Sequence, residues 1–90
     1  MYKPSISALI EIIRKAQSDV VELDSAISLY QQGGGSEAVI YALASCRDQN
    51  QRFCVGMFSD IATHDEEQTE EQTEQIESLV ATHAELFPSN

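Results

Sequence analysis

Carboxylates provide most of the chemistry that this sequence offers, and they gather in one segment. The run from Asp65 to Gln75 contains the tetrapeptide Glu-Glu-Gln-Thr twice in tandem. On a helix this four-residue period would align Glu66, Glu70 and Glu74, and like charges at that spacing destabilise a helix by roughly 0.2–0.5 kcal/mol per pair. No Lys or Arg follows Arg52 to relieve the repulsion. The segment is therefore either a solvated, solubilising face or a surface whose repulsion a cationic partner relieves.

We predict that the acidic segment binds a protein surface rich in Lys and Arg, so that the chain acts as an inhibitor or adaptor. The predicted partner-binding residues are Asp65, Glu66, Glu67, Glu70, Glu71, Glu74 and Glu77. Carboxylates one helical turn apart are separated by about 5–6 Å, which is comparable to the spacing of successive phosphates on a nucleic-acid strand. The basic surface could thus belong to a nucleic-acid-binding protein whose groove the acidic helix occupies.

Mimicry of nucleic acid is a device of small acidic phage proteins that block host nucleic-acid enzymes, anti-CRISPR proteins among them. The chain is similar to these proteins in composition alone, because it carries no sequence motif of such a family. This similarity implies a phage or mobile-element origin and an anti-CRISPR-like inhibitory role.

The charge balance disfavours several other partners. The chain has 15 acidic and 5 basic residues, and residues 53–90 contain nine of the acidic residues and no Lys or Arg. Direct nucleic-acid binding is disfavoured because its affinity comes largely from Lys and Arg on phosphates, and an anionic membrane would repel the chain. No apolar run approaches the roughly 20 residues of a membrane span, and the N-terminus lacks a signal-peptide pattern. We therefore expect no direct contact with nucleic acid or membrane and a cytoplasmic location, in a bacterial or host cell.

Cysteine and histidine give little support for catalysis or metal binding. Cys46 and Cys54 would be about 12 Å apart on one helix, which is too far for a disulfide; both are expected to be packed apolar residues in a reduced environment. His64 is expected to be a capping or solvated residue rather than a metal ligand, and His83 a partly buried, hydrogen-bonded one. The chain also lacks the Gly-x-Ser-x-Gly, phosphate-loop and dinucleotide-binding motifs. We expect no enzyme activity, no catalytic residue, no metal and no cofactor.

The elements that position these residues are predicted to be helices. From Ser5 to Gln32 the apolar side chains follow a heptad repeat with no Pro or Gly, which predicts a helix over residues 5–32 capped by Ser5. Its two heptad positions hold Ile6, Ile13, Val20 and Ile27, and Leu9, Ala16, Leu23 and Tyr30. Further apolar residues lie off this seam, so the helix is expected to be contacted from two sides.

Three glycines, Gly33-Gly34-Gly35, predict a turn into a second, antiparallel helix over residues 37–63. The seam of that helix consists of Val39, Leu43, Cys46, Asn50, Phe53, Met57 and Ile61. Asn50 thus takes a core position, where it would favour one register or oligomeric state. A third helix is predicted over residues 65–87, because Thr63 and Glu66 have the spacing of a capping box and apolar residues recur from residue 76 to 87.

Together these patterns predict an all-α fold: one domain, residues 1–90, with a long antiparallel helical hairpin and a third, acidic C-terminal helix. The wide apolar faces favour a helical-bundle homodimer, with a monomeric three-helix bundle as the alternative. The dimer or core seam would consist of Ile6, Leu9, Ile13, Val20, Leu23, Ile27, Tyr30, Phe53 and Met57. The alternative function is a structural dimerisation module with no inhibitory role. In that case the seam mediates dimerisation, and the acidic segment only keeps the chain soluble.

Overall fold

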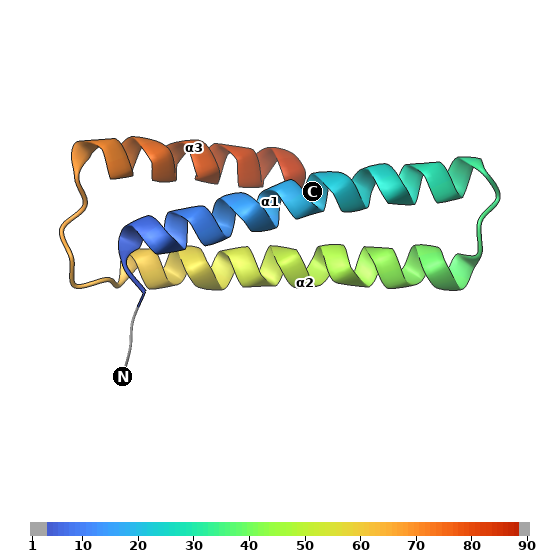
Figure 1. Ribbon diagram of the computed structural model, residues 1–90, viewed down its shortest axis with the longest axis horizontal. Helices are drawn as coiled ribbons and strands as arrows, with labels where there is room; N and C mark the ends of the chain where they lie inside the picture. The colour runs from blue at the N-terminus through green and yellow to red at the C-terminus, as the bar shows by residue number, and fades with distance from the viewer. Residues whose placement is uncertain (1–3, 89–90) are drawn as a thin grey trace.

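The computed structural model describes residues 4–88, which form three α-helices. Helix α1 spans Ile6–Gln32, α2 spans Glu37–Ala62 and α3 spans Glu70–Leu86. The molecule is a rod of 49 × 27 × 22 Å in which α1 and α2 form an antiparallel hairpin (Figure 1). Helix α3 packs on α1, runs in the same direction and ends near the middle of the hairpin (Figure 1). The predicted all-α fold with a hairpin and a third helix is confirmed, whereas the homodimer stays a prediction.

The core lies where all three helices overlap, in the half of the hairpin that contains the start of α1. Helix α1 provides most of it, through Ile6, Leu9, Ile10, Ile13, Ala16 and Val20. Toward the hairpin turn Leu23 and Ile27 are half-buried and Tyr30 is exposed, because α3 ends before it reaches this part of α1. The predicted seam of α1 is therefore packed along its first half and opens toward the turn.

Local signals set the ends of the hairpin helices as predicted. Ser5 Oγ accepts a hydrogen bond from the N–H of Ala8 at 3.1 Å and so caps α1. In the turn, Gly34 has φ +70°, a conformation that favours glycine. Gly35 donates its N–H to the carbonyl of Tyr30 at 2.7 Å, and a Cβ at Gly35 would lie 2.7 Å from the Tyr30 ring. The turn therefore requires glycine at both positions.

The packed face of α2 differs from the predicted seam. Its buried residues are Cys54 and Ile61, and Met57 packs against the core. Three residues of the predicted seam, Val39, Cys46 and Phe53, are exposed in the single chain. The expectation that Cys46 is packed is therefore wrong, whereas a place for Phe53 in a dimer seam stays a prediction. The packed face of α2 turns away from these residues because the inner heptad position before Cys54 is Arg47, a cation that a count of apolar residues passes over. Arg47 is accommodated there because its guanidinium reaches Asp24 of α1.

Helix α3 begins at residue 70, not at the predicted residue 65. The capping box forms at Thr69 and Gln72: Thr69 Oγ1 accepts the N–H of Gln72 at 3.1 Å, and Gln72 Oε1 accepts the N–H of Thr69 at 3.0 Å. Thr63 instead ends α2, where its N–H donates to the carbonyl of Ser59 at 3.1 Å. The predicted box at Thr63 and Glu66 is therefore wrong, because Thr63 is already used as the C-cap of the preceding helix.

Candidate protein-docking surface

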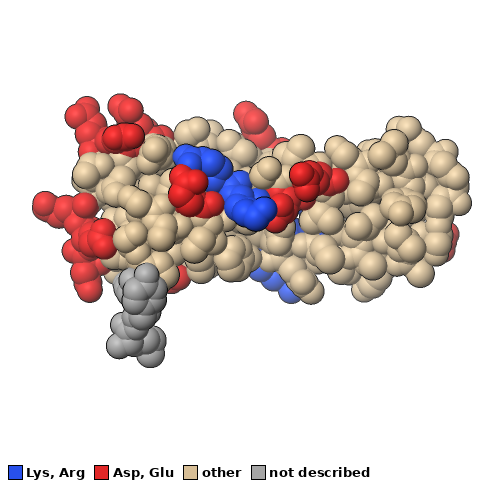
Figure 2. Space-filling model, viewed as in Figure 1, with Lys and Arg blue, Asp and Glu red and all other residues tan. Residues whose placement is uncertain are grey.

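The seven carboxylates predicted to bind a partner are all exposed and gather toward one end of the rod. We call this surface the acidic end; it consists of Asp65, Glu66, Glu67, Glu70, Glu71, Glu74 and Glu77. Figure 2 shows acidic side chains around the end where α2 connects to α3, whereas the opposite end carries few charges on the face shown. Three of these residues lie in the connection and four on α3.

The carboxylates of α3 point away from the hairpin because the other side of this helix packs on α1. Leu79 is buried and Ile76 packs against the core. Glu70, Glu74 and Glu77 follow the i, i+4, i+7 spacing that places residues on one face of a helix, here the outer one. The predicted stripe that began at Glu66 is wrong, since Glu66 precedes α3 and lies in the connection.

No described cation balances the acidic end. Among residues 4–88, the ion pairs of Lys and Arg lie within the hairpin and join Glu11 to Arg14, Lys15 to Asp19, and Asp24 to Arg47. At the acidic end, the nearest approach of a basic group is His64 Nε2 at 3.9 Å from Glu66 Oε1. The seven carboxylates therefore repel one another, although Glu70 and Glu71 gain from the dipole at the start of α3.

His64 fastens the connection between α2 and α3 to the start of α1. Its side chain is 5% exposed, its Nε2 donates to the carbonyl of Pro4 at 2.7 Å, and its Nδ1 accepts the N–H of Glu66 at 3.1 Å. Nearby, Gln72 Nε2 donates to Ser7 Oγ at 3.1 Å. Both ring nitrogens of His64 are thus occupied, so the expectation of a capping or solvated histidine is replaced by a buried structural one.

A buried glutamine fixes the middle of α3 to α1. Gln17 Nε2 donates to the carbonyl of Leu79 at 2.8 Å, and both residues are buried. Sequence reasoning missed Gln17 because its side chain is polar. Its spacing carried the signal, since Gln17 lies four residues after Ile13 and three before Val20, on the same buried face.

Arg47 joins all three helices near the end of α3. Its Nε donates to Asp24 Oδ1 at 2.6 Å, its Nη2 donates to the carbonyl of Leu86, and its guanidinium lies 4.7 Å from the centre of the Phe87 ring. A cation at the C-terminus of a helix is favoured by the helix dipole. This role was not predictable from the sequence, because the three partners of Arg47 are distant in the chain.

His83 packs between aromatic rings without the hydrogen bond expected for it. Its ring lies 5.7 Å from that of Phe58 and 4.8 Å from that of Phe87, measured between centroids. Its Nδ1 is buried with no hydrogen-bond partner. Burial lowers the pKa of His83, because the charged imidazolium would lose solvation there.

The described part of the chain contains neither a metal-binding group nor a membrane-spanning helix, and one of its two thiols is exposed. Within residues 4–88, no group of three His, Cys, Asp or Glu side chains could hold a metal ion. Over the same range, none of the helices has the length and apolar character that crossing a membrane requires. Cys54 is buried, which raises the pKa of its thiol, whereas Cys46 is exposed.

Comparison with known proteins places the chain in no established group. None of the protein-family models, curated proteins or solved structures compared with it matches.

Proposed function

We propose that the chain is a binding protein rather than an enzyme, and that it acts as an inhibitor or adaptor by docking its acidic end on a basic protein surface. The observation that supports this most is the exposure of seven carboxylates that pair with no described Lys or Arg. A Lys- and Arg-rich surface would relieve their mutual repulsion and would speed association. The contacts of Gln17 and Arg47 hold α3 in place before binding, so less conformational entropy is lost on docking.

Within this proposal, the basic surface belongs to a nucleic-acid-binding protein. Glu70, Glu74 and Glu77 present negative charge once per helical turn, about every 5–6 Å, and three further carboxylates lie in the connection that precedes this helix. An acidic helix of this kind could take the place of a nucleic-acid strand in a basic groove. A phage or mobile-element inhibitor of the anti-CRISPR kind would act in this way, and its gene would lie among phage or mobile-element genes.

The test is to capture partners from bacterial lysate on the immobilised chain and to measure the affinity of a captured protein against variants. Glu74→Lys with Glu77→Lys reverses two exposed charges on the outer face of α3. We expect this pair to weaken binding at least about 10-fold. Wild-type affinity should fall as salt is added, because salt screens exposed charges.

A matched control reverses two exposed carboxylates of the hairpin, Glu22→Lys with Asp48→Lys. Both pairs change the net charge equally, so only a localised docking surface predicts different affinities. Equal weakening by the two pairs would rule out docking through the acidic end. Competition by DNA and RNA tests whether the chain mimics nucleic acid. If nucleic acid does not displace the chain from its partner, mimicry is ruled out, but docking of the acidic end on a basic surface is not.

A second candidate function is a structural dimerisation module in which two hairpins form a helical bundle. Exposed apolar side chains on the hairpin favour it, namely Ile12 at 37% and Phe53 at 46% exposure. In this case partner capture would be insensitive to the charge reversals, and self-association would depend on the apolar residues.

A further inference from the structure

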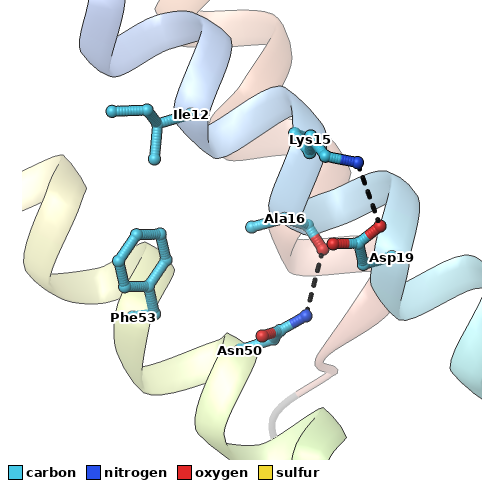
Figure 3. A pocket seen from close by; sticks show the side chains of 6 residues that line it. All are labelled: Ile12, Lys15, Ala16, Asp19, Asn50 and Phe53. Atoms are coloured by element: carbon cyan, nitrogen blue, oxygen red, sulfur yellow. Dashed lines mark hydrogen bonds and ion pairs between the residues drawn. The ribbon is translucent and has the colours of Figure 1, made fainter.

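An open apolar groove runs between α1 and α2. It has a volume of about 320 Å³ and is lined by Ile12, Lys15, Ala16, Asp19, Asn50 and Phe53. Figure 3 shows the side chains of Ile12 and Phe53 pointing into the same space from opposite helices. Asn50 Nδ2 lies 3.5 Å from the carbonyl of Ala16 at the floor, and Lys15 Nζ lies 3.7 Å from Asp19 Oδ1 at the rim (Figure 3).

The groove lies on the side of the hairpin that faces away from α3. Gln17 of α1 donates to α3, whereas Lys15 and Asp19 are each two residues away from Gln17, or about 200° around the helix. The hairpin therefore has two contact faces. Helix α3 covers one of them, and the other is open.

The open face carries a heptad stripe that the single chain does not bury. Val39, Cys46 and Phe53 are exposed and follow one another at intervals of seven residues along α2. On α1, the apolar residues Ile12 and Ala16 line the groove beside this stripe. A seven-residue repeat of apolar side chains is the pattern of a helix that packs along a partner helix. These exposed residues therefore have the spacing needed to pack against a helix of another chain.

We infer that this face binds a second copy of the chain, with the two hairpins antiparallel about a two-fold axis through the groove. Charge favours this occupant. The chain as a whole has a net charge of −10, but the residues that line the groove include one cation and one anion, Lys15 and Asp19. The groove at the centre of the face is therefore neutral, so two acidic copies can meet there, and an antiparallel arrangement keeps their acidic ends apart.

The available area also fits a dimer. Helix α2 has 26 residues, so the face is about 40 Å long, and two packed helices make it about 20 Å wide, which gives about 800 Å² per partner, the size of a standard stable interface. The groove lies near the middle of α2 and in the first half of α1, so a two-fold axis there still overlaps most of the two hairpins. Asn50 would sit near this axis, where a buried Asn fixes the register of paired helices.

The test is the molar mass of the full chain by light scattering and sedimentation over a wide concentration range. We expect wild type to reach twice its 10.0 kDa mass. Phe53→Glu should weaken the dimer at least about 30-fold, as loss of an interface hot spot does. Val55→Glu is the matched control, because Val55 lies two residues away on α2, is 54% exposed and points away from the groove.

Ile12→Glu supplies a second disruption from the other helix, and helix content measured by circular dichroism shows that each variant is folded. A monomeric wild type at all concentrations overturns the inference. A dimer that survives both groove substitutions, or that Val55→Glu abolishes equally, overturns it too. Added salt should strengthen this dimer by screening the acidic copies and should weaken docking on a basic partner. Since the groove variants keep all seven carboxylates, loss of the dimer and loss of partner capture are separate results.

Discussion

At the scale of single residues, the two cysteines of α2 differ in expected reactivity because one is buried and the other is exposed. Cys54 is fully buried, and burial raises the pKa of its thiol because a thiolate would lose solvation; Cys46 is exposed. At concentrations where the chain is monomeric and Cys46 is not covered by a second copy, we expect a thiol reagent at neutral pH to modify Cys46 alone in the native chain. Cys54 should react only on unfolding, so Cys46→Ser should be inert until denaturant is added. Peptide mass spectrometry after timed labelling measures this, and rapid native labelling of Cys54 would contradict it.

His83 should make stability depend on pH. Burial lowers the pKa of His83 in the folded chain, so its contribution to stability is present above the unfolded value of about 6.5 and is lost as the pH falls through the lower, folded value. We therefore expect the free energy of unfolding to fall as the pH drops below about 6.5. His83→Phe keeps a ring beside Phe58 and Phe87 and removes the unpaired Nδ1.

Urea unfolding of wild type and His83→Phe across this pH range isolates the effect, because all other titrating groups are shared by the two chains. The variant should lose this part of the pH dependence and should be no less stable near neutral pH, since a buried unpaired nitrogen is costly. An identical pH dependence in both chains would rule out the role of His83.

At the scale of elements, the first helix and the glycine turn were predictable because their signals are local. The heptad pattern of α1, the cap at Ser5 and the φ of Gly34 depend on neighbouring residues alone. The packed face of α2 was not predictable in this way, because Arg47 occupies an inner position only through partners on α1 and α3. The start of α3 was misplaced because two capping boxes of equal spacing compete, and the end of α2 decides between them.

The N-caps of α2 and α3 provide a matched pair for measuring what the capping box contributes to stability. Thr69 accepts the N–H of Gln72 and completes a capping box, whereas Ser36 caps α2 without a side-chain hydrogen bond. Thr69→Ala should therefore lower the free energy of unfolding by about 1 kcal/mol, and Ser36→Ala should change it much less. Chemical denaturation of both variants measures the difference. Equal losses would show that the capping box is not formed in solution.

At the scale of the whole molecule, the sequence predicted the acidic end but not how it is held. The position of seven carboxylates in one segment is visible in the chain itself. The tethers that orient them join residues far apart in sequence: His64 to Pro4, Gln17 to Leu79, and Arg47 to Leu86. Each tether uses a polar side chain that pattern reading assigns to the surface. The acidic end is thus visible in the sequence, whereas the contacts that hold it in place form only when the chain folds.

Arg47 offers the sharpest test of that support, because one side chain contacts all three helices. In Arg47→Met, Asp24 loses its partner, the carbonyl of Leu86 loses a charged donor, and Phe87 loses the cation above its ring.

We expect Arg47→Met to lower the free energy of unfolding by about 1–3 kcal/mol, within the range for hydrogen bonds to charged groups in a partly exposed site. Arg52→Met is the control, since Arg52 is exposed on the same helix and its loss removes the same charge. Amide hydrogen exchange should locate the effect: the last turns of α3 should lose protection in Arg47→Met, while the first half of α1 should keep it, because its side chains form the core that remains. Uniform loss of protection in all three helices would mean that α3 and the hairpin unfold as one unit, and that Arg47 stabilises the whole core instead of the end of α3.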